Sequence, residues 1–254
     1  MPSAPTPSDH ELAGRAATEA GRLLVDLRAR LAAEGHDPAR IKDEGDRRAH
    51  LFLLDLLTRE APRDAVLSEE GKDDPVRLTT ERVWIVDPLD GTREFSEEGR
   101  TDWAVHVALA IGGDVVVGAV SLPARGITLT TVPAPPPLPP PPSAAEPRIL
   151  VSRTRPPAEA EVLRQALGGR LVPMGSAGAK AMAVVLGDAD IYAHSGGQYE
   201  WDSAAPAAVA MAAGLHVSRL DGSPLRYNRP DPWLPDLLIC RMDLADPVLS
   251  ALRS

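Results

Sequence analysis

The residues best suited to chemistry in this chain are two aspartates at the end of a predicted buried strand. The segment Val83–Val86 is short, apolar and rich in β-branched residues, and Asp87 and Asp90 follow it. Two carboxylates about 4 Å apart repel by roughly 4 kcal/mol at an effective dielectric near 20. A cation or a shared proton relieves that repulsion, and carboxylate oxygens suit magnesium. The pair therefore indicates a metal site, with a turn in which aspartate accepts local hydrogen bonds as the alternative.

Two further acidic segments could supply the same centre. Glu69 and Glu70 follow a short apolar run, and Glu200 and Asp202 directly precede an alanine-rich predicted helix. Taken singly, each is typical of a helix cap or a solvated charge. Taken together they favour an all-oxygen site for a hard cation, because the sequence has no cluster of histidine and cysteine that would select zinc.

The first half of the chain must position most of these residues. Ser8 and Glu11 form a capping-box pattern that predicts the start of a helix, and Gly35 ends it. A second helix is predicted from about Asp46 to Arg59. Strands are predicted at 83–86, 103–111, 115–120 and 127–132, with a hairpin turn at 112–113. This half is therefore expected to be α+β.

The second half alternates between strand and helix. Strands are predicted at 148–151, 171–172, 191–193, 215–218 and 237–240, and helices at 158–167, 177–186, 203–213 and the C-terminus. Such alternation is typical of a layered α/β unit. We expect four parts: a disordered tail at 1–9, an α+β domain at 10–132 with most metal ligands, a proline-rich linker at 133–147, and an α/β domain at 148–254 that completes the active site.

The proline-rich run Pro133–Pro142 cannot join a packed sheet, because proline lacks the backbone N–H that a sheet ladder needs. We interpret it as a stiff surface linker. A docking segment for an aromatic groove on a partner is the alternative.

Composition excludes several classes of protein. The 254 residues include 27 lysines and arginines against 36 aspartates and glutamates, a net charge of −9. A nucleic acid polymer is therefore not an expected partner, because proteins that bind the phosphate backbone normally present a basic face. The single cysteine, Cys240, excludes an internal disulfide. No apolar run is long enough for a membrane span and the N-terminus lacks an apolar signal core, so the cytoplasm is the expected location.

Three motifs follow one another along the chain: Ser68-Glu69-Glu70, then Asp87-Pro88-Leu89-Asp90-Gly91-Thr92, then Trp201-Asp202-Ser203-Ala204-Ala205. With these motifs, the chain from about Asp9 onward resembles the inositol monophosphatase superfamily of magnesium-dependent, lithium-sensitive phosphatases. Three further segments are similar to its CysQ branch, the 3′(2′),5′-bisphosphate nucleotidases: Arg93-Glu94-Phe95, Val151-Ser152-Arg153 and residues 175–180. The resemblance implies a layered αβαβα sandwich of the sugar-phosphatase fold, α+β in its first half and α/β in its second, with the active site between the halves.

The resemblance also implies the ligands of two magnesium ions. Glu69, Asp87 and the backbone carbonyl of Leu89 would hold the first ion, and Asp87, Asp90 and Asp202 the second. A third ion near Asp46 and Glu69 stays open, because the segment 41–46 departs from the family's usual pattern.

The resemblance assigns the remaining roles around the phosphate. Asp46 and Thr92 would be catalytic and act on the attacking water. The second phosphate of a bisphosphate nucleotide needs cationic or N–H donors outside the metal site, and Lys180 and Arg153 are the candidates, with Ser152 and Ser176 as hydroxyl donors. An exposed helix lysine and a surface arginine are the alternatives for the two cationic residues. The predicted substrate-binding set is Glu69, Leu89, Asp90, Gly91, Thr92, Ser152, Arg153, Ser176, Lys180 and Asp202.

The expected reaction is hydrolysis of 3′-phosphoadenosine 5′-phosphate to AMP and phosphate, which clears a by-product of sulfate assimilation. Hydrolysis of inositol 1-phosphate or fructose 1,6-bisphosphate, or a dual specificity, is the alternative. A catalytically silent metal- or nucleotide-binding regulator is more remote, since every acidic position and Thr92 are present. The only partners expected are a small phosphate ester and a second copy of the chain, because the family commonly forms homodimers.

Several other polar residues lie near these motifs. His106 falls in an apolar strand and is interpreted as a packed core histidine. His194, Gln198 and Tyr199 come just before the third motif, so a place at the border of the substrate stays open for them.

Overall fold

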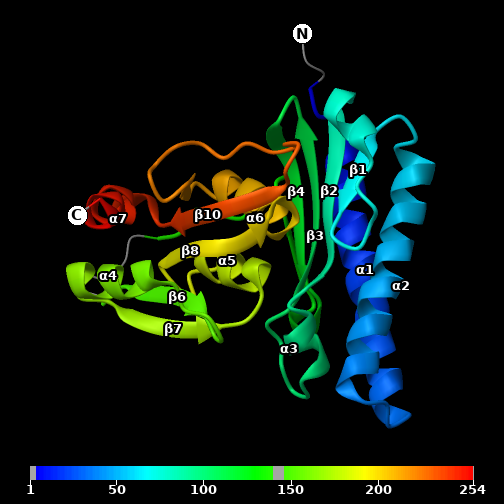
Figure 1. The fold of residues 1–254 in the computed structure, drawn as a ribbon, viewed down its shortest axis with the longest axis horizontal. Coiled ribbons are helices and arrows are strands. Elements are labelled where there is room, and N and C mark those ends of the chain that lie inside the picture. Colours follow the sequence, from blue (N-terminus) through cyan, green and yellow to red (C-terminus); the bar gives the residue numbers. More distant parts are fainter. Residues whose placement is uncertain (1–3, 140–145, 254) are drawn as a thin grey trace.

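The computed structural model describes residues 4–139 and 146–253, which form two five-stranded sheets (Figure 1). The strands of the first sheet are β1 (Ala65–Ser68), β2 (Arg82–Asp90), β3 (Ala104–Ile111), β4 (Asp114–Leu122) and β5 (Ile127–Thr130), in that spatial order. The second sheet has the order β7-β6-β8-β10-β9, from β6 (Arg148–Ser152), β7 (Arg170–Met174), β8 (Ile191–Tyr199), β9 (His216–Ser218) and β10 (Trp233–Cys240). Both sheets mix parallel and antiparallel pairs.

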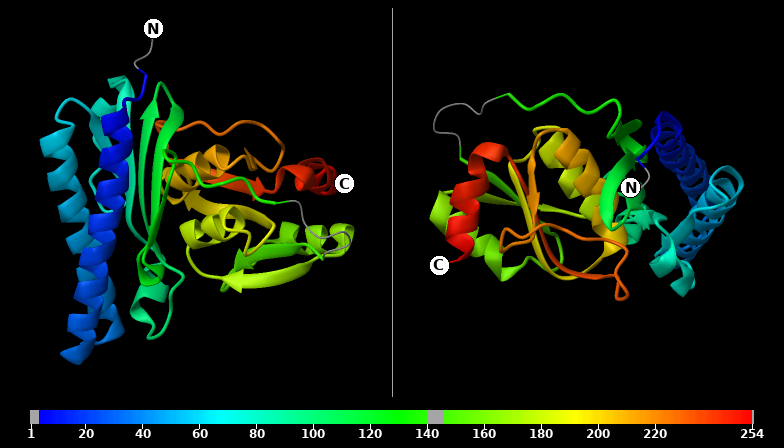
Figure 2. Two further views of the ribbon diagram at one scale, coloured as in Figure 1. Left: turned by 180° about the vertical axis from the view of Figure 1, so that it is seen from behind. Right: turned by 90° about the horizontal axis from the view of Figure 1, so that it is seen from above.

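The helices form three layers around the two sheets (Figures 1 and 2). They are α1 (Pro7–Ala33), α2 (Pro38–Glu60), α3 (Thr92–Ser96), α4 (Ala158–Leu167), α5 (Ala177–Val185), α6 (Glu200–Ala212) and α7 (Ala245–Leu252). One core joins α1 and α2 to the first sheet, a second joins α5 and α6 to both sheets, and a third joins α4 and α7 to the second sheet. The predicted αβαβα sandwich is thus confirmed.

The first sheet is buried on both faces, and the alternation of side chains along β2 shows how. Trp84 and Val86 belong to the core under α1 and α2, whereas Val83 and Ile85 belong to the core under α5 and α6. Gly118 on β4 lets α6 approach, because a Cβ there would lie 2.7 Å from the Ala208 Cβ. The second half therefore covers a face of the first sheet, and the division into domains at 10–132 and 148–254 stays a prediction.

Both long helices of the first half begin earlier than predicted. In α1, Thr6 is the N-cap and forms the capping box with Asp9, whose carboxylate accepts the Thr6 N–H at 2.7 Å. The expected box of Ser8 and Glu11 is wrong, and so is disorder for residues 7–9 of the predicted tail, while residues 1–3 lie outside the described residues. In α2, Asp37 is the N-cap and accepts the Arg40 N–H at 2.8 Å, so the helix includes the whole charged segment before Asp46.

The remaining predicted elements are present: α4 has the predicted bounds, and the ends of the others are shifted. The strands β8 and β10 are longer than predicted, and α6 begins at Glu200 instead of Ser203. The first turn of α6 therefore carries Asp202. In the described residues, no helix is long and apolar enough to cross a membrane.

The proline-rich segment leaves β5 and runs over the outside of the second half (Figure 2). Pro135 is buried, Leu138 packs against the central core, and the Pro139 carbonyl accepts a hydrogen bond from the Arg241 guanidinium at 2.8 Å. Residues 140–142 of the predicted run lie outside the described residues. The docking alternative stays untested.

A fully buried arginine ties the two halves together. Arg77 lies in a short 3-10 helix (Pro75–Thr79) after β1 and donates to Asp73 at 2.6 Å. The same guanidinium donates to Asn228 Oδ1 at 2.9 Å and to the Arg229 carbonyl at 2.8 Å. Glu200 accepts the backbone N–H groups of both latter residues, at 2.6 and 2.8 Å. The segment before β10 is thus held between the first half and the start of α6.

Candidate active site

Three aspartates from the two halves form one acidic cluster. Asp87 and Asp90 end β2 and Asp202 lies in the first turn of α6, and one carboxylate oxygen from each lies within 4.8 Å of the others. Residues three apart on a regular strand point to opposite faces. Here the pairing of β2 with β3 is irregular between Asp87 and Asp90, and that bulge turns both side chains to one centre.

Few groups of the protein would compensate a negative charge on Asp87 or Asp202. Asp87 is buried, and burial together with the carboxylates of Glu69, Asp90 and Asp202 raises its pKa well above the usual value. Burial and Asp90 raise the pKa of Asp202 to about 7, although its Oδ2 accepts the Tyr199 N–H at 2.7 Å. A bound cation would relieve this repulsion, so the oxygen donors present fit a hard divalent metal ion.

Asp90 has a different environment, because it faces the N-terminus of α5. The Ser176 hydroxyl and the backbone N–H groups of Ala177 and Gly178 donate to its carboxylate, the last two at 3.1 and 2.6 Å. Burial opposes the charge, but the nearby His106 ring, the bond from Ser176 and the nearby Lys180 ammonium lower the pKa of Asp90 to about 2. Asp90 therefore stays ionised without a metal.

His106 belongs to this site, which the sequence did not indicate. It is fully buried, as a packed core histidine would be, but its Nε2 lies 3.3 Å from Asp90 and its Nδ1 lies 3.0 Å from the Trp201 carbonyl. A Cβ on Gly178 would lie only 2.0 Å from His106 Nε2, so the glycine makes room for the ring. The strand register would have indicated this position, because His106 on β3 is paired with Asp87 on β2.

A second acidic group reaches the cluster from the first half. Glu69 directly follows β1; desolvation and the charges of Asp90, Glu70 and Asp46 raise its pKa to about 7. Burial and the charges of Glu70 and Asp43 raise the pKa of Asp46, on α2, to about 7 as well. Asp46, Glu69 and Glu70 thus lie close enough to influence one another.

The loop after Asp90 has a backbone conformation that favours glycine at position 91. Gly91 has φ of +86° and begins the short helix α3, whose first residue is Thr92. A side chain at position 91 would be strained at this φ, and its Cβ would lie 3.0 Å from the Ser176 Cβ. On α2, Gly45 packs against Phe95 and Leu89, where a Cβ would come within 2.7 and 2.8 Å. This contact places Asp46 beside the loop.

Three of the donors predicted for a second phosphate, Ser176, Lys180 and Arg153, already donate to groups within the protein. Lys180 is buried, and its ammonium donates to the Ser176 carbonyl at 2.6 Å. Arg153 pairs with Glu94 at 2.7 Å and Glu97 at 2.9 Å. Ser152 accepts the Arg155 N–H at 3.2 Å. Their substrate-binding roles stay predictions.

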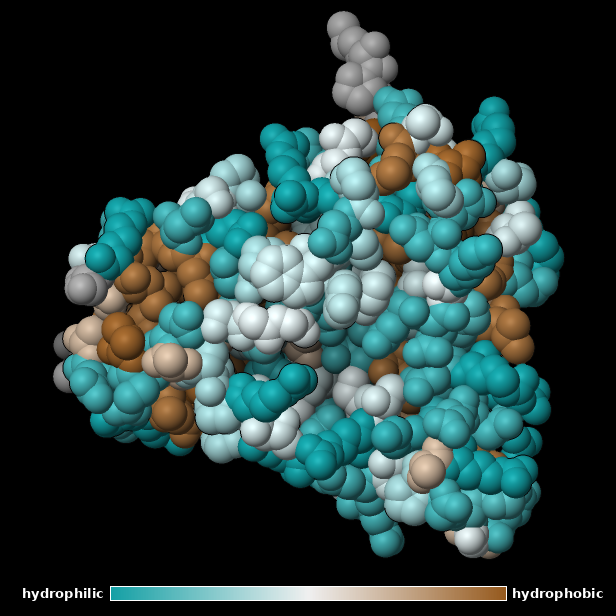
Figure 3. All heavy atoms as spheres, viewed as in Figure 1, coloured by the Kyte–Doolittle hydropathy of each residue, from teal (hydrophilic) through white to brown (hydrophobic). Residues whose placement is uncertain are grey.

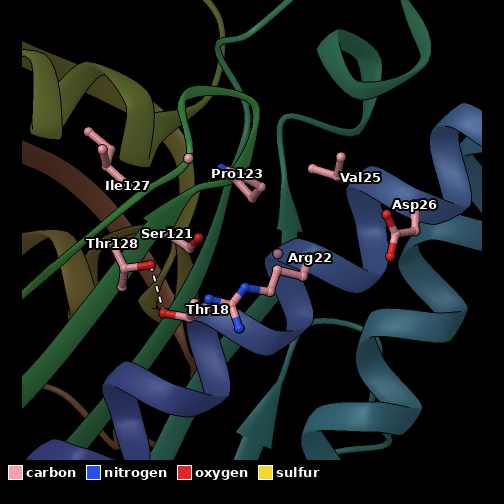
Figure 4. A pocket seen from close by; sticks show the side chains of 10 residues that line it. Thr18, Arg22, Val25, Asp26, Ser121, Pro123, Ile127 and Thr128 are labelled. Carbon is pink, nitrogen blue, oxygen red and sulfur yellow. Dashed lines mark hydrogen bonds between the residues drawn. The ribbon is translucent and has the colours of Figure 1, made fainter.

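A separate hollow of about 370 Å³ lies between α1 and the β4–β5 hairpin (Figure 4). Thr18 and Thr128 share a hydrogen bond of 2.8 Å there, and Arg22 and Asp26 lie along the helix side. None of the predicted site residues lines it. Depth alone therefore does not locate the candidate active site, which is identified by its carboxylates.

Comparison with known proteins agrees with the motifs. The family model described as the inositol monophosphatase family matches residues 10–242. A 3′-phosphoadenosine 5′-phosphate phosphatase from Mycobacterium leprae is 53% identical over 97% of this chain and 94% of its own length. The 3′(2′),5′-bisphosphate nucleotidase CysQ from Escherichia coli strain K12 is 32% identical over 73% of this chain and 79% of its own length.

Solved structures show the same fold. Inositol monophosphatase II from Staphylococcus aureus superposes with a TM-score of 0.79 at 21% identity, covering 96% of this chain and 95% of the other. CysQ from Bacteroides thetaiotaomicron gives 0.74 at 27% identity, covering 92% and 97%.

Proposed function

Because the chain belongs to the inositol monophosphatase family, we propose that it hydrolyses 3′-phosphoadenosine 5′-phosphate to AMP and phosphate with Mg²⁺. One observation carries the choice of substrate. Over 97% of its length the chain is 53% identical to a protein named for that activity. In a cell, the reaction would clear a by-product of sulfate assimilation.

The acidic cluster supports the metal requirement. Two magnesium ions would be held by Glu69, Asp87 and the Leu89 carbonyl, and by Asp87, Asp90 and Asp202. When bound, they would neutralise phosphate charge, lower the pKa of a water and stabilise the leaving oxygen. The proximity of Asp46, Glu69 and Glu70 supports a third, weaker position.

The chain's own groups would orient the phosphate and the attacking water. Gly91 and Thr92 present backbone N–H groups at the start of α3. Thr92 Oγ1 would hold the water, and an Asp46 carboxylate oxygen would accept its proton. A pKa of about 7 suits a general base that works near neutral pH. No side chain needs to form a covalent intermediate.

A second candidate is broader hydrolysis of inositol 1-phosphate or fructose 1,6-bisphosphate. The observation that favours it is the internal bonding of Arg153 and Lys180, which engages the two cationic groups predicted for the second phosphate of the nucleotide. A silent regulator would bind ligand without turnover. We also propose that the protein forms a homodimer and is located in the cytoplasm. Sedimentation tests the first proposal and cell fractionation the second.

A phosphate-release assay tests these proposals together. We expect Mg²⁺-dependent release from 3′-phosphoadenosine 5′-phosphate with AMP as the chromatographed product, and the highest kcat/KM on this substrate among the three esters. Lithium or calcium should suppress release, because both disturb a site built for magnesium. Full activity in EDTA would contradict the metal mechanism, and higher kcat/KM on inositol 1-phosphate would contradict the substrate.

A further inference from the structure

Exposed aromatic side chains gather at one place in this molecule. Only nine of the 254 residues are aromatic, and five of them are buried: Trp84, Phe95, Trp103, Tyr192 and Tyr227. Tyr199 and Trp233 are exposed, by 41% and 43%, and they are directly opposite each other across β8 and β10. Directly paired residues of neighbouring strands project from the same face of a sheet, so the two rings share one face.

A third ring completes the group. The Tyr199 and Trp201 rings are stacked, with centroids 4.8 Å apart and planes 8° from parallel. Trp201 packs partly against the central core, so it supports the more exposed ring of Tyr199. In Figure 3, which has the same view as Figure 1, residues of intermediate hydropathy lie in the middle of the visible surface.

The backbone on both sides of this stack is fixed to the acidic cluster. The Tyr199 N–H donates to Asp202 at 2.7 Å, and the Trp201 carbonyl lies 3.0 Å from His106 Nδ1. The stack is therefore a rigid neighbour of the carboxylates that would hold the metal. On the strand before it, Gly196 and Gly197 have no atoms within 4 Å of where a Cβ would stand, so space beside the strand is open.

We propose that the exposed face of Tyr199, backed by Trp201, stacks against the adenine ring of the substrate. The inference rests on the proposed function and adds the residue that distinguishes a nucleotide from a simple phosphate ester. A flat aromatic ring stacks on a nucleobase independently of charge. Such a contact is needed here, because Arg153 and Lys180 are bonded to protein groups and discrimination by charge alone is weakened.

The test compares three esters that share only the scissile phosphate. 3′-Phosphoadenosine 5′-phosphate has the base and a second phosphate, 3′-AMP has the base alone, and glycerol 2-phosphate has neither. Tyr199→Ala should lower kcat/KM on both adenine esters by about 5- to 150-fold, chiefly through KM, because base stacking on an aromatic side chain is commonly this strong. On glycerol 2-phosphate the change should stay within about two-fold, and Tyr199→Phe should restore the wild-type values on all three.

Binding without turnover gives an independent readout. Adenine stacked beside Trp201 should quench its fluorescence, so titration with AMP reports the contact directly. Tyr199→Ala should weaken AMP by about the same factor as it lowers kcat/KM. The matched control is Met211→Ala, at an exposed position near the other end of α6, which should change neither measurement.

Several outcomes would overturn the inference. These are equal losses on all three esters, no loss on any, a loss confined to the bisphosphate, or a change of oligomeric state without a change in AMP binding. If the wild type releases no phosphate from 3′-phosphoadenosine 5′-phosphate, the proposed function fails separately. The AMP titration of Tyr199→Ala against the wild type still decides the aromatic contact in that case.

Discussion

The acidic cluster has two parts, here called the α5 corner and the metal corner, and the pKa values of their carboxylates shift in opposite directions. In the α5 corner, Asp90 accepts hydrogen bonds from Ser176, Ala177 and Gly178, and its pKa is lowered to about 2. In the metal corner, Asp87, Asp202 and Glu69 face one another with few donors, and their pKa values are raised. Crowding of carboxylates therefore does not decide their charge. The donors around each carboxylate decide it.

The largest expected effect is that of Asp87→Asn in the metal corner. Loss of a carboxylate that would serve both ions should lower kcat by about 100-fold or more. The amide oxygen can still accept the Leu89 N–H, which lies 3.0 Å from Asp87 Oδ1. Because the substitution also removes repulsion, the melting temperature in EDTA should rise. Near-wild-type turnover, or a fall in that melting temperature, would show that Asp87 is structural.

Asp90→Asn should do the opposite to the stability of the metal-free protein. The amide NH₂ would face an N–H or hydroxyl donor of the α5 corner, and hydrogen bonds to a charged acceptor contribute about 1.5–3 kcal/mol. The free energy of unfolding in EDTA should fall by about that amount, measured by urea denaturation. If repulsion between carboxylates dominated, the free energy of unfolding would rise instead. The sign of the change therefore shows whether lost hydrogen bonds or relieved repulsion dominates at Asp90.

A matched control for Asp90→Asn is Asp114→Asn. Asp114 is mostly exposed and forms an ion pair with the exposed Arg226 at the surface. Exposed ion pairs contribute about 0–1 kcal/mol, so this variant should unfold almost as the wild type does. A large effect there would mean that loss of any carboxylate destabilises this acidic chain.

The smallest expected effect is a pH dependence that distinguishes the corners. A carboxyl with a raised pKa binds more protons in the folded state, so its contribution is present below about pH 4 and lost as the pH rises through about 7. In EDTA the melting temperature should therefore fall by a few degrees between about pH 4 and pH 7. Asp90 acts in the opposite window, because its lowered pKa stabilises the fold above about pH 4 and the contribution is lost toward pH 2.

Magnesium is the control for that measurement. A bound cation keeps Asp87 and Asp202 ionised, so saturating Mg²⁺ should flatten the decline and raise the melting temperature most near pH 7. A melting temperature in EDTA that rises steadily from pH 4 to pH 7 would contradict the raised pKa values of the metal corner.

The sequence predicted the layers and nearly every strand, because apolar periodicity and turn residues are local signals. It missed the start of α2, since the charged run before Asp46 has only one large apolar residue, Ile41, on its buried face and contains Gly45. That glycine is there for a contact with Phe95 and Leu89, which only the folded chain brings together. The motifs also named the acidic residues, and their family is confirmed.

The sequence could not show which polar groups are already satisfied. A lysine four residues after Ser176 looks available for a ligand, but one helical turn carries its ammonium back to the Ser176 carbonyl. Arg153 likewise looked free, and its partners Glu94 and Glu97 come from the other half of the chain. Such pairings depend on how the two halves of the chain pack together. Local sequence patterns do not contain that information.

The buried Arg77 has a consequence for the order in which the chain is completed during synthesis. Its partner Asn228 is 151 residues further along, and the neighbouring Arg229 carbonyl also accepts from it. A ribosome that has made the first sheet has not yet made the groups that enclose this guanidinium, nor the helix α6 that covers the sheet's second face. The N-terminal half must therefore wait, with its arginine still in water, until nearly the entire protein has emerged. Truncated nascent chains would lack the contacts that hold the segment before β10 against Glu200 at the start of α6, the helix that carries Asp202.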